Sequence, residues 1–141
     1  MTGTKRKGTY LLFLMFRNPA ELNAGSLGKL FLNAGEYCYT GSAMNGLDNR
    51  IERHLKREKK VRWHIDNLTI CADDIEAYMS LDPVPECILS RTASECGCTP
   101  VFKGFGCSDC RCATHLFFVN EVSKQKLLNA TGAVPFLKNN V

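Results

Sequence analysis

The segment 8–16, GTYLLFLMF, restricts the fold more than any other part of the chain. Apolar and β-prone residues follow one another almost without interruption, whereas a strand with one solvated face alternates apolar and polar residues. The segment therefore predicts a β-strand buried on both faces. The strands and helices expected elsewhere do not alternate in the β-α-β order of a parallel sheet. We accordingly expect an α+β fold, with a small antiparallel or mixed β-sheet flanked by helices.

Turn signals predict the next two segments. Residues 17–28 contain Pro19 and several Gly and Asn residues, which favours a loop. The letters NAG at 33–35 are typical of a tight turn between strands. They predict a β-hairpin over residues 29–41.

Apolar residues spaced by four predict the first helix. Leu47, Ile51 and Leu55 form one apolar stripe, and Asn45 with Asp48 resembles a capping box at its start. The stripe indicates a helix that packs one side and leaves the other to solvent. Further helices are expected at 62–68, 86–95 and 124–129, and further strands at 74–81 and 113–122.

Length and charge set the broad class. The chain has 141 residues and is expected to form a single domain, 1–141. Its net charge of +4 is consistent with a polyanionic partner. The apolar run 10–16 is far below the roughly 20 residues of a membrane span, so we expect no membrane partner and a cytoplasmic location. The eight cysteines are then reduced thiols or metal ligands.

Arg50 and His54 lie four residues apart, so they share one face of the expected helix. Arg57 continues this row. An arginine there can bind a phosphate through two hydrogen bonds and stabilise charge that develops during hydrolysis. The alternative is that this face is simply solvated.

The order of several short motifs resembles a known nuclease superfamily. Gly8-Thr9-Tyr10 is followed by Tyr39-Thr40-Gly41 and then by RIERH at 50–54. This order resembles the GIY-YIG nucleases. The longer frame, GEYCYTGSA with RIERHLKREKKVRWHIDNL and GFGCSDCRCATHLFF, resembles the DUF123 proteins, also called the Uri type of GIY-YIG domain. The likeness covers residues 8–119.

The resemblance implies a role for each matching residue. Tyr10 corresponds to the tyrosine that is proposed as general base, and Tyr39 to the second tyrosine of the same pocket. Gly41 corresponds to the glycine that lets the backbone turn closely beneath the phosphate. Arg50 corresponds to the arginine that stabilises the transition state, and His54 to the histidine one turn later.

The resemblance also implies a second histidine and a metal. His64 falls where some members carry another active-site histidine. The family uses a glutamate on a later helix to hold one divalent metal, and Glu86 is the first candidate, before Glu95 and Glu76. Mg²⁺ or Mn²⁺ suits a site with one carboxylate and several waters. The alternative for Glu86 is that it only favours a helix N-terminus.

These features predict a metal-dependent endonuclease that acts on DNA, for which repair and recombination are candidate settings. An alternative is a module of the same fold that binds nucleic acid without cutting it. Basic residues next to the expected site would contact phosphates, or would form a solvated helix end. They are Lys56, Arg57, Lys59, Lys60 and Arg62. Trp63 could stack on a base, but a single Trp among apolar positions favours the core.

A cluster of cysteines gives a third hypothesis. Cys107, Cys110, Cys112 and His115 have a ligand set that suits tetrahedral zinc. The alternative, which we prefer, is that these cysteines are small buried hydrophobic residues. The isolated cysteines are expected in the core: Cys38, Cys71 and Cys87.

Overall fold

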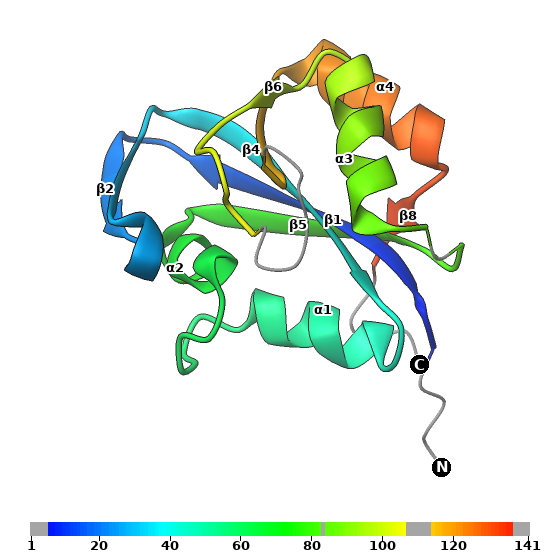
Figure 1. The fold of residues 1–141 in the computed structure, drawn as a ribbon, viewed down its shortest axis with the longest axis horizontal. Coiled ribbons are helices and arrows are strands. Elements are labelled where there is room, and N and C mark those ends of the chain that lie inside the picture. The colour runs from blue at the N-terminus through cyan, green and yellow to red at the C-terminus, as the bar shows by residue number, and fades with distance from the viewer. Residues whose placement is uncertain (1–5, 83, 107–113, 137–141) are drawn as a thin grey trace.

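The structure, a computed structural model, describes residues 6–82, 84–106 and 114–136. Its main sheet has the strand order β6-β7-β4-β1-β5-β8, and each neighbouring pair is antiparallel (Figure 1). The strands are β1 (Gly8–Phe16), β4 (Gly35–Ala43), β5 (Asp74–Ser80), β6 (Thr99–Pro100), β7 (Leu116–Val119) and β8 (Val134–Pro135). The described helices are α1 (Leu47–Leu55), α2 (His64–Cys71), α3 (Glu86–Glu95) and α4 (Glu121–Thr131). The prediction of an α+β fold is confirmed.

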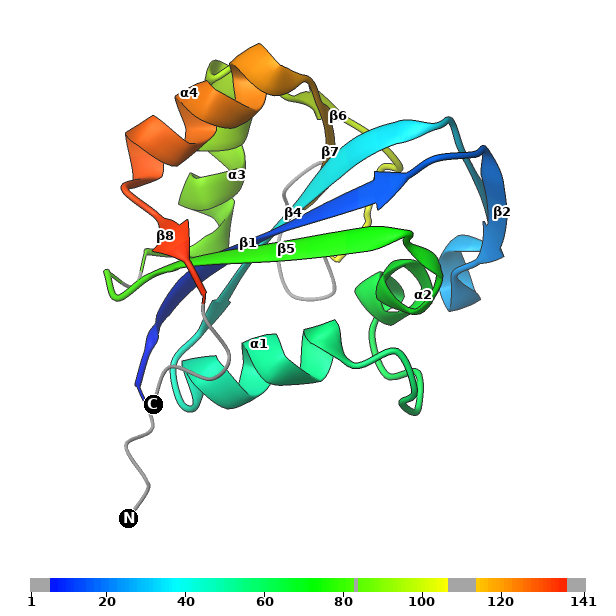
Figure 2. The ribbon, with the colours of Figure 1, turned by 180° about the vertical axis from the view of Figure 1, so that it is seen from behind.

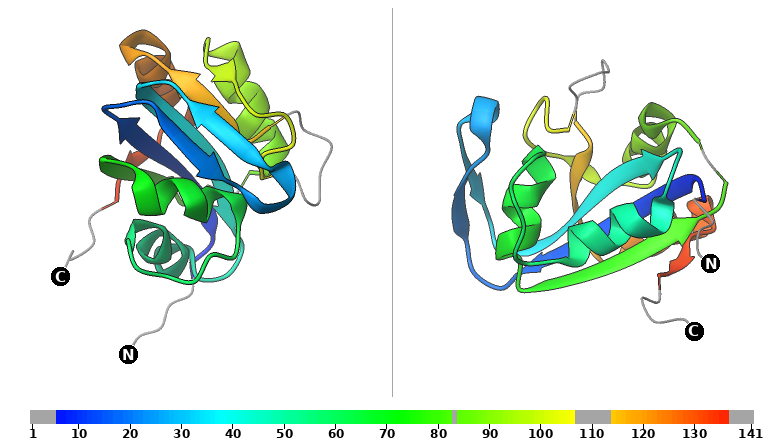
Figure 3. Two further views of the ribbon diagram at one scale, coloured as in Figure 1. Left: turned by 90° about the vertical axis from the view of Figure 1, so that its left-hand side faces the viewer. Right: turned by 90° about the horizontal axis from the view of Figure 1, so that it is seen from below.

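Different helices cover the two faces of this sheet. α1 and α2 lie on one face, and α3 and α4 lie on the other (Figures 2 and 3). β1 lies between β4 and β5, and its side chains alternate between the two cores. Tyr10, Leu12 and Leu14 pack in the core on the α1–α2 side. Leu11 and Phe13 pack in the core on the α3–α4 side, so the expected burial of this strand on both faces is confirmed.

The hairpin predicted over residues 29–41 is wrong. β4 pairs with β1 along its whole length, from Gly35 opposite Phe16 to Ala43 opposite Gly8. β7 pairs with the other edge of β4, so β4 has no edge left for the segment before it. That segment forms β3 (Lys29–Leu32) in a separate two-stranded sheet.

The loop predicted over residues 17–28 is also wrong. Residues Ala20–Asn23 form β2, the antiparallel partner of β3. The short 3-10 helix η1 (Gly25–Leu27) joins the two strands, and Gly28 closes the turn with a φ of 76°. The two strands bury alternate side chains against the α1–α2 core, including Leu30 and Leu32, and this tertiary packing outweighs the local turn signals.

The start of α1 differs from the predicted capping box. Its N-cap residue is Gly46, and the amides of Gly46 and Leu47 donate to the carbonyl oxygen of Arg6. Asp48 accepts two hydrogen bonds from the guanidinium of Arg6, at 2.9 and 2.6 Å. The segment that precedes β1 therefore caps this helix, which local sequence cannot show.

The later elements agree with the sequence more closely. β5 and α3 match their predicted ranges to within one residue. The strand predicted at 113–122 is shorter, because Asn120 is the N-cap of α4 and its side chain accepts from the amide of Ser123 at 2.8 Å. Cys38 is buried as expected, but Cys71 is exposed and Cys87 is half-buried, so the core prediction is wrong for these two. None of the helices in the described ranges is long and apolar enough to cross a membrane.

Candidate active site

The β1–β4 ladder places Tyr10 against Gly41. The two residues are direct partners in the antiparallel register. A Cβ atom on residue 41 would lie 2.4 Å from Cζ of Tyr10 and 2.5 Å from its hydroxyl oxygen. The tyrosine ring therefore lies across the backbone of β4 at a position without a side chain. This close approach explains why the second motif ends in glycine.

Tyr10 and His54 form a buried pair. Oη of Tyr10 and Nε2 of His54 lie 3.0 Å apart and share a hydrogen bond. The two residues are 3% and 1% exposed. The expectation that His54 shares a solvent-facing cationic surface with Arg50 is therefore wrong. α1 turns His54 towards the sheet, where it packs beside the apolar stripe of Leu47 and Ile51.

Burial sets the protonation of this pair. It lowers the pKa of His54 to about 3, with a further contribution from the positive charge of Lys59. It raises the pKa of Tyr10 to about 12, against the opposing effect of Arg50. At neutral pH Tyr10 is thus a phenol and His54 a neutral imidazole. Nδ1 of His54 has no hydrogen-bond partner among the described residues.

Arg50 lies next to the Tyr10–His54 pair, near the C-terminal end of β4. Its Nη1 donates to the carbonyl oxygen of Ser42 at 3.5 Å. Its guanidinium lies 5.0 Å from the ring centroid of Trp63, within cation–π distance. The charge of Arg50 acts directly on Tyr10, since it is the largest influence that lowers the pKa of this phenol. Arg50 is half-buried, so part of its side chain remains accessible.

Glu86 reaches the same position from the opposite face of the sheet. β7 pairs with β4 along Glu36–Tyr39, and the amide of Thr40 donates to the carbonyl oxygen of His115. Beyond Thr40, no strand of the described residues pairs with this edge of β4. There the amide and hydroxyl of Ser42 both donate to Oε1 of Glu86, each at 3.3 Å. Ser42 therefore links Glu86 on one side to Arg50 on the other. The negative charge of Glu86 also acts on Tyr10 and raises its pKa.

A second contact fixes the angle of α3 against β4. One turn after Glu86, Oγ of Ser90 lies 2.9 Å from Oγ1 of Thr40, two residues before Ser42. Four helical residues and two strand residues span nearly equal lengths, about 6.0 and 6.8 Å. The two pairs of contacts therefore align the helix with the strand and hold Glu86 at the open edge.

His115 belongs to this anchor. Its Nδ1 lies 2.6 Å from Oγ of Ser90 and 3.2 Å from Oγ1 of Thr40, and the residue is fully buried. Burial lowers its pKa, so it is held as a neutral ring. The other predicted zinc ligands lie outside the described residues: Cys107, Cys110 and Cys112. Within residues 6–82, 84–106 and 114–136, no group of three or more metal-binding side chains is assembled.

Trp63 is fixed by a buried carboxylate. Asp66 accepts two hydrogen bonds from Arg53, each at 2.9 Å, and one each from the amides of Arg62 and Trp63. Burial alone would raise the pKa of Asp66, but Arg53 and the two amides lower it. The guanidinium of Arg53 also lies 4.5 Å from the ring centroid of Trp63. The indole is half-buried and held beside Arg50.

A small cavity opens beside Trp63. Its volume is about 250 Å³, and it is lined by Tyr39, Arg62, Trp63, His64 and Gly106. Nδ1 of His64 accepts a hydrogen bond from the amide of Gly106 at 3.2 Å. Tyr39 joins the cavity to the buried pair, because its ring centroid lies 6.4 Å from that of His54. His64 is therefore near the site, but in the wall of this cavity rather than beside Tyr10.

A known protein family matches nearly the whole chain. The model of the family described as domain of unknown function DUF123 matches residues 9–134. The chain belongs to the DUF123 family. The match runs from β1 to β8 and includes all residues of the Tyr10 site. A search of curated proteins and a search of solved structures found no match.

The basic segment of this DUF123 domain divides into two groups. Arg57 donates to the carbonyl oxygens of Ala72 and Asp73. Nζ of Lys59 donates to the carbonyl oxygens of Arg53 and His54, at 3.0 and 2.9 Å, and so caps the end of α1. Burial lowers the pKa of Lys59 to about 8. Lys59 is half-buried, whereas the exposed residues of this segment are Lys56, Arg57, Lys60 and Arg62.

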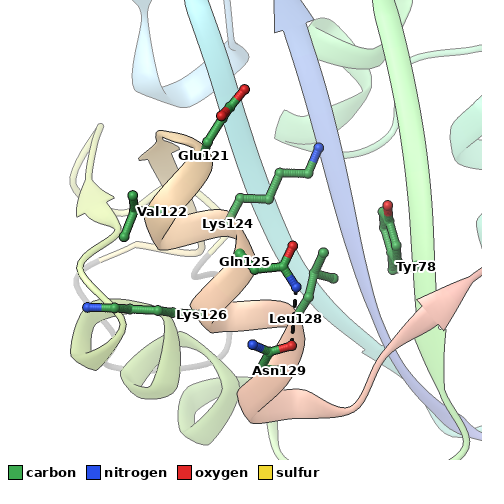
Figure 4. A pocket seen from close by; sticks show the side chains of 8 residues that line it. All are labelled: Tyr78, Glu121, Val122, Lys124, Gln125, Lys126, Leu128 and Asn129. Carbon is green, nitrogen blue, oxygen red and sulfur yellow. Dashed lines mark hydrogen bonds between the residues drawn. The ribbon is translucent and has the colours of Figure 1, made fainter.

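The two weaker carboxylate candidates of the DUF123 domain lie elsewhere. Glu95 is at the far end of α3, and Glu76 accepts from Lys124 at 2.8 Å. Lys124 belongs to a larger cavity of about 710 Å³ between α4 and β5 (Figure 4). None of the predicted site residues lines that cavity. Its lining residues are Tyr78, Glu121, Val122, Lys124, Gln125, Lys126, Leu128 and Asn129.

Sequence reasoning missed Ser42, Ser90 and Asp66. Ser42 follows directly after the second motif, but no local pattern indicates that it contacts both Arg50 and Glu86. Asp66 had a detectable signal, because the side chain of an acidic residue at the third position of a helix can accept a hydrogen bond from the backbone amide of the N-cap residue. Ser90 had none, since its partners come from β4 and from the residue before β7.

Proposed function

We propose that this DUF123 domain is a metal-dependent endonuclease that hydrolyses phosphodiester bonds in DNA, with a site of the GIY-YIG type. One observation carries the proposal. Arg50 and Glu86 meet at Ser42 from opposite faces of the sheet, and the charges of both act on Tyr10. A phenol, a guanidinium and a carboxylate around one open strand edge suit an in-line displacement at phosphorus.

Arg50 would stabilise the charge that develops on the phosphoryl oxygens. Its stacking on Trp63 and its hydrogen bond to Ser42 hold the guanidinium before substrate arrives. Such preorganisation is worth about 10²–10³ in rate for a single donor group. The fixed guanidinium thus needs little reorganisation during the reaction.

Tyr10 would orient and activate the attacking water. With a pKa of about 12, its hydroxyl is protonated at neutral pH, so the base role requires its pKa to fall when substrate binds. Arg50 already lowers the pKa of Tyr10 in the free protein. Nε2 of His54 holds the phenol in one orientation, and the neutral imidazole adds no charge to the site.

Glu86 is the residue that would hold Mg²⁺ or Mn²⁺. Its carboxylate is half-buried and accepts hydrogen bonds from Ser42 through one oxygen, Oε1. Mg²⁺ typically takes one or two carboxylates and keeps several waters and substrate oxygens, which fits this donor set. When bound, the metal supplies a Lewis acid that neutralises phosphoryl charge and acidifies water.

A second candidate is a DNA-binding module that does not cleave. The observation that favours it is the burial of Tyr10, which is only 3% exposed and strongly disfavours the phenolate. Binding would then rely on the exposed basic side chains: Lys56, Arg57, Lys60 and Arg62. The two candidates differ in whether Arg50 and Glu86 are needed for turnover.

Nicking of supercoiled and branched DNA with Mg²⁺ or Mn²⁺ tests the proposal. We expect Arg50→Ala to lower the rate by about 10²–10³, and Glu86→Gln to remove metal-dependent cleavage. Arg17→Ala and Glu95→Gln are matched controls, since Arg17 pairs with Asp74 at the surface and Glu95 lies at the other end of α3. Both controls should cleave as the wild type does.

Two outcomes would contradict the enzyme. Cleavage that persists unchanged in Arg50→Ala and Glu86→Gln would come from a contaminating nuclease. Salt-sensitive binding without cleavage of any substrate would instead support the binding module.

A further inference from the structure

The cavity beside Trp63 has the chemistry of a binding site for a planar ring. Three of its five lining residues are aromatic or heteroaromatic, namely Tyr39, Trp63 and His64. The fourth, Arg62, is a planar cation on the exposed surface, and Gly106 leaves one wall without a side chain. Nucleobases stack on aromatic rings and on guanidinium planes.

The size of the cavity restricts its occupant. About 250 Å³ is below the range of roughly 300–1,000 Å³ that is typical of pockets for drug-sized ligands. The space suits a single base and excludes a base pair or a peptide helix. Hydrogen bonds anchor two of the lining residues, because the backbone amide of Trp63 donates to Asp66 and the amide of Gly106 donates to Nδ1 of His64.

Two walls of the cavity are shared with the candidate active site. Tyr39 contacts the ring of His54, which is hydrogen-bonded to Tyr10. Trp63 carries the guanidinium of Arg50 at 5.0 Å. A base held between Tyr39 and Trp63 would therefore belong to a nucleotide next to the phosphate that Arg50 contacts.

We infer that this cavity binds one unpaired nucleobase of a DNA strand, so that the substrate carries an extrahelical or single-stranded nucleotide beside the scissile phosphate. The inference rests on the proposed endonuclease function and names its substrate class. A base inside an intact duplex is stacked on both sides and cannot enter a cavity of this size without leaving the stack. Fully paired DNA should therefore bind more weakly than DNA with an unpaired base.

The chain has a single tryptophan, Trp63, so tryptophan fluorescence reports on this cavity and on the adjacent guanidinium of Arg50. The probes are three duplexes: a fully paired duplex, the same duplex with one extrahelical thymidine, and the latter with an abasic site in place of that thymidine. Binding is measured without divalent metal, by Trp63 fluorescence and by anisotropy of labelled DNA. The abasic duplex keeps the bend and the phosphates and lacks only the base.

We expect the extrahelical thymidine to quench Trp63 and the abasic duplex to leave it unquenched. The abasic duplex should bind about 5- to 150-fold more weakly, the range that base–aromatic stacking provides. His64→Ala should bring this ratio close to one. Phe31→Ala, at an exposed aromatic residue of β3 outside the cavity, should leave the ratio unchanged.

Equal affinity and equal quenching for the thymidine and abasic duplexes would overturn the inference, as would the absence of binding to all three. The inference and the proposed function can fail separately. Base-dependent quenching without cleavage in Mg²⁺ would leave the base site standing and remove the enzyme. Cleavage at the same rate with and without the unpaired base would support the enzyme and remove the base site. Trp63→Phe, which keeps an aromatic wall, should retain the preference measured by anisotropy.

Discussion

The buried neutral state of His54 makes the stability of this DUF123 domain depend on pH in a defined way. The folded pKa of His54 is lowered to about 3 from an ordinary value of 6.5. Folding therefore favours the neutral ring, and the unfolded chain binds a proton that the folded chain does not. The stability contributed by this group is present at neutral pH. It is lost as pH falls below about 6.5 towards 3.

The magnitude follows from linkage. Between pH 7 and pH 5 the unfolded chain takes up about 0.7 of a proton at His54, whereas the folded chain takes up almost none. The free energy of unfolding should then fall by about 2 kcal/mol from this residue alone. Carboxylates with lowered pKa values, such as Asp48 and Asp66, lose their contribution only near and below 3.8. They do not change within this window.

Urea denaturation of the wild type at pH 7 and pH 5 measures the loss. Both His54→Gln and His54→Phe remove the titrating imidazole. The first variant replaces it by a neutral polar side chain and the second by an apolar ring. Both should be less stable than the wild type at pH 7, yet both should lose about 2 kcal/mol less between the two pH values. Any contribution of His115, whose pKa is also lowered, is common to all three proteins and cancels. Equal losses in all three would refute a neutral, buried His54.

Gly41→Ala should lower the free energy of unfolding by about 1–3 kcal/mol, because its Cβ would lie 2.4 Å from Cζ of Tyr10; unchanged urea stability would show that this ring has room to move. If Tyr10 is the base, kcat/KM for cleavage should rise about tenfold per pH unit between about pH 6 and 9, because kcat/KM reports the pKa of the free protein, which is about 12; a plateau of kcat/KM in this range would contradict that role. Asp66→Asn should destabilise the fold by about 3–5 kcal/mol, since it removes the charge of a buried, ion-paired carboxylate, and thermal unfolding would check this. Replacing Lys56 and Lys60 together by Ala should reduce the slope of log K against log salt by about 2; an unchanged slope in filter binding would exclude them as phosphate contacts.

The sequence by itself determined the strongly patterned elements. Both faces of β1 carry apolar side chains, and each face packs in a hydrophobic core. The burial of this strand therefore follows from its composition alone. The bounds of α3 follow from a proline before its first turn and from helix-forming residues within it. The ordered motifs of Tyr10, Tyr39 and Arg50 can be recognised in the sequence, because they consist of short local strings.

The tertiary structure decided which of those residues meet. Tyr10 and His54 are 44 residues apart in sequence, as are Ser42 and Glu86, and no local pattern indicates either contact. Helical spacing correctly put Arg50 and His54 on neighbouring turns, but it could not show that His54 faces the sheet. The burial that makes His54 neutral exists only once α1 packs on β1 and β4.

The edges of the sheet account for the remaining differences. Whether β3 pairs with β4 or with β2 depends on which strand edges are already occupied, and β1 and β7 occupy both edges of β4. Beyond Thr40, no strand in the described part of the chain pairs with the outer edge of β4, and Ser42 binds Glu86 there. Hydrogen-bonding edges belong to the assembled sheet and not to any one segment, because each backbone amide pairs with a strand that is distant in sequence.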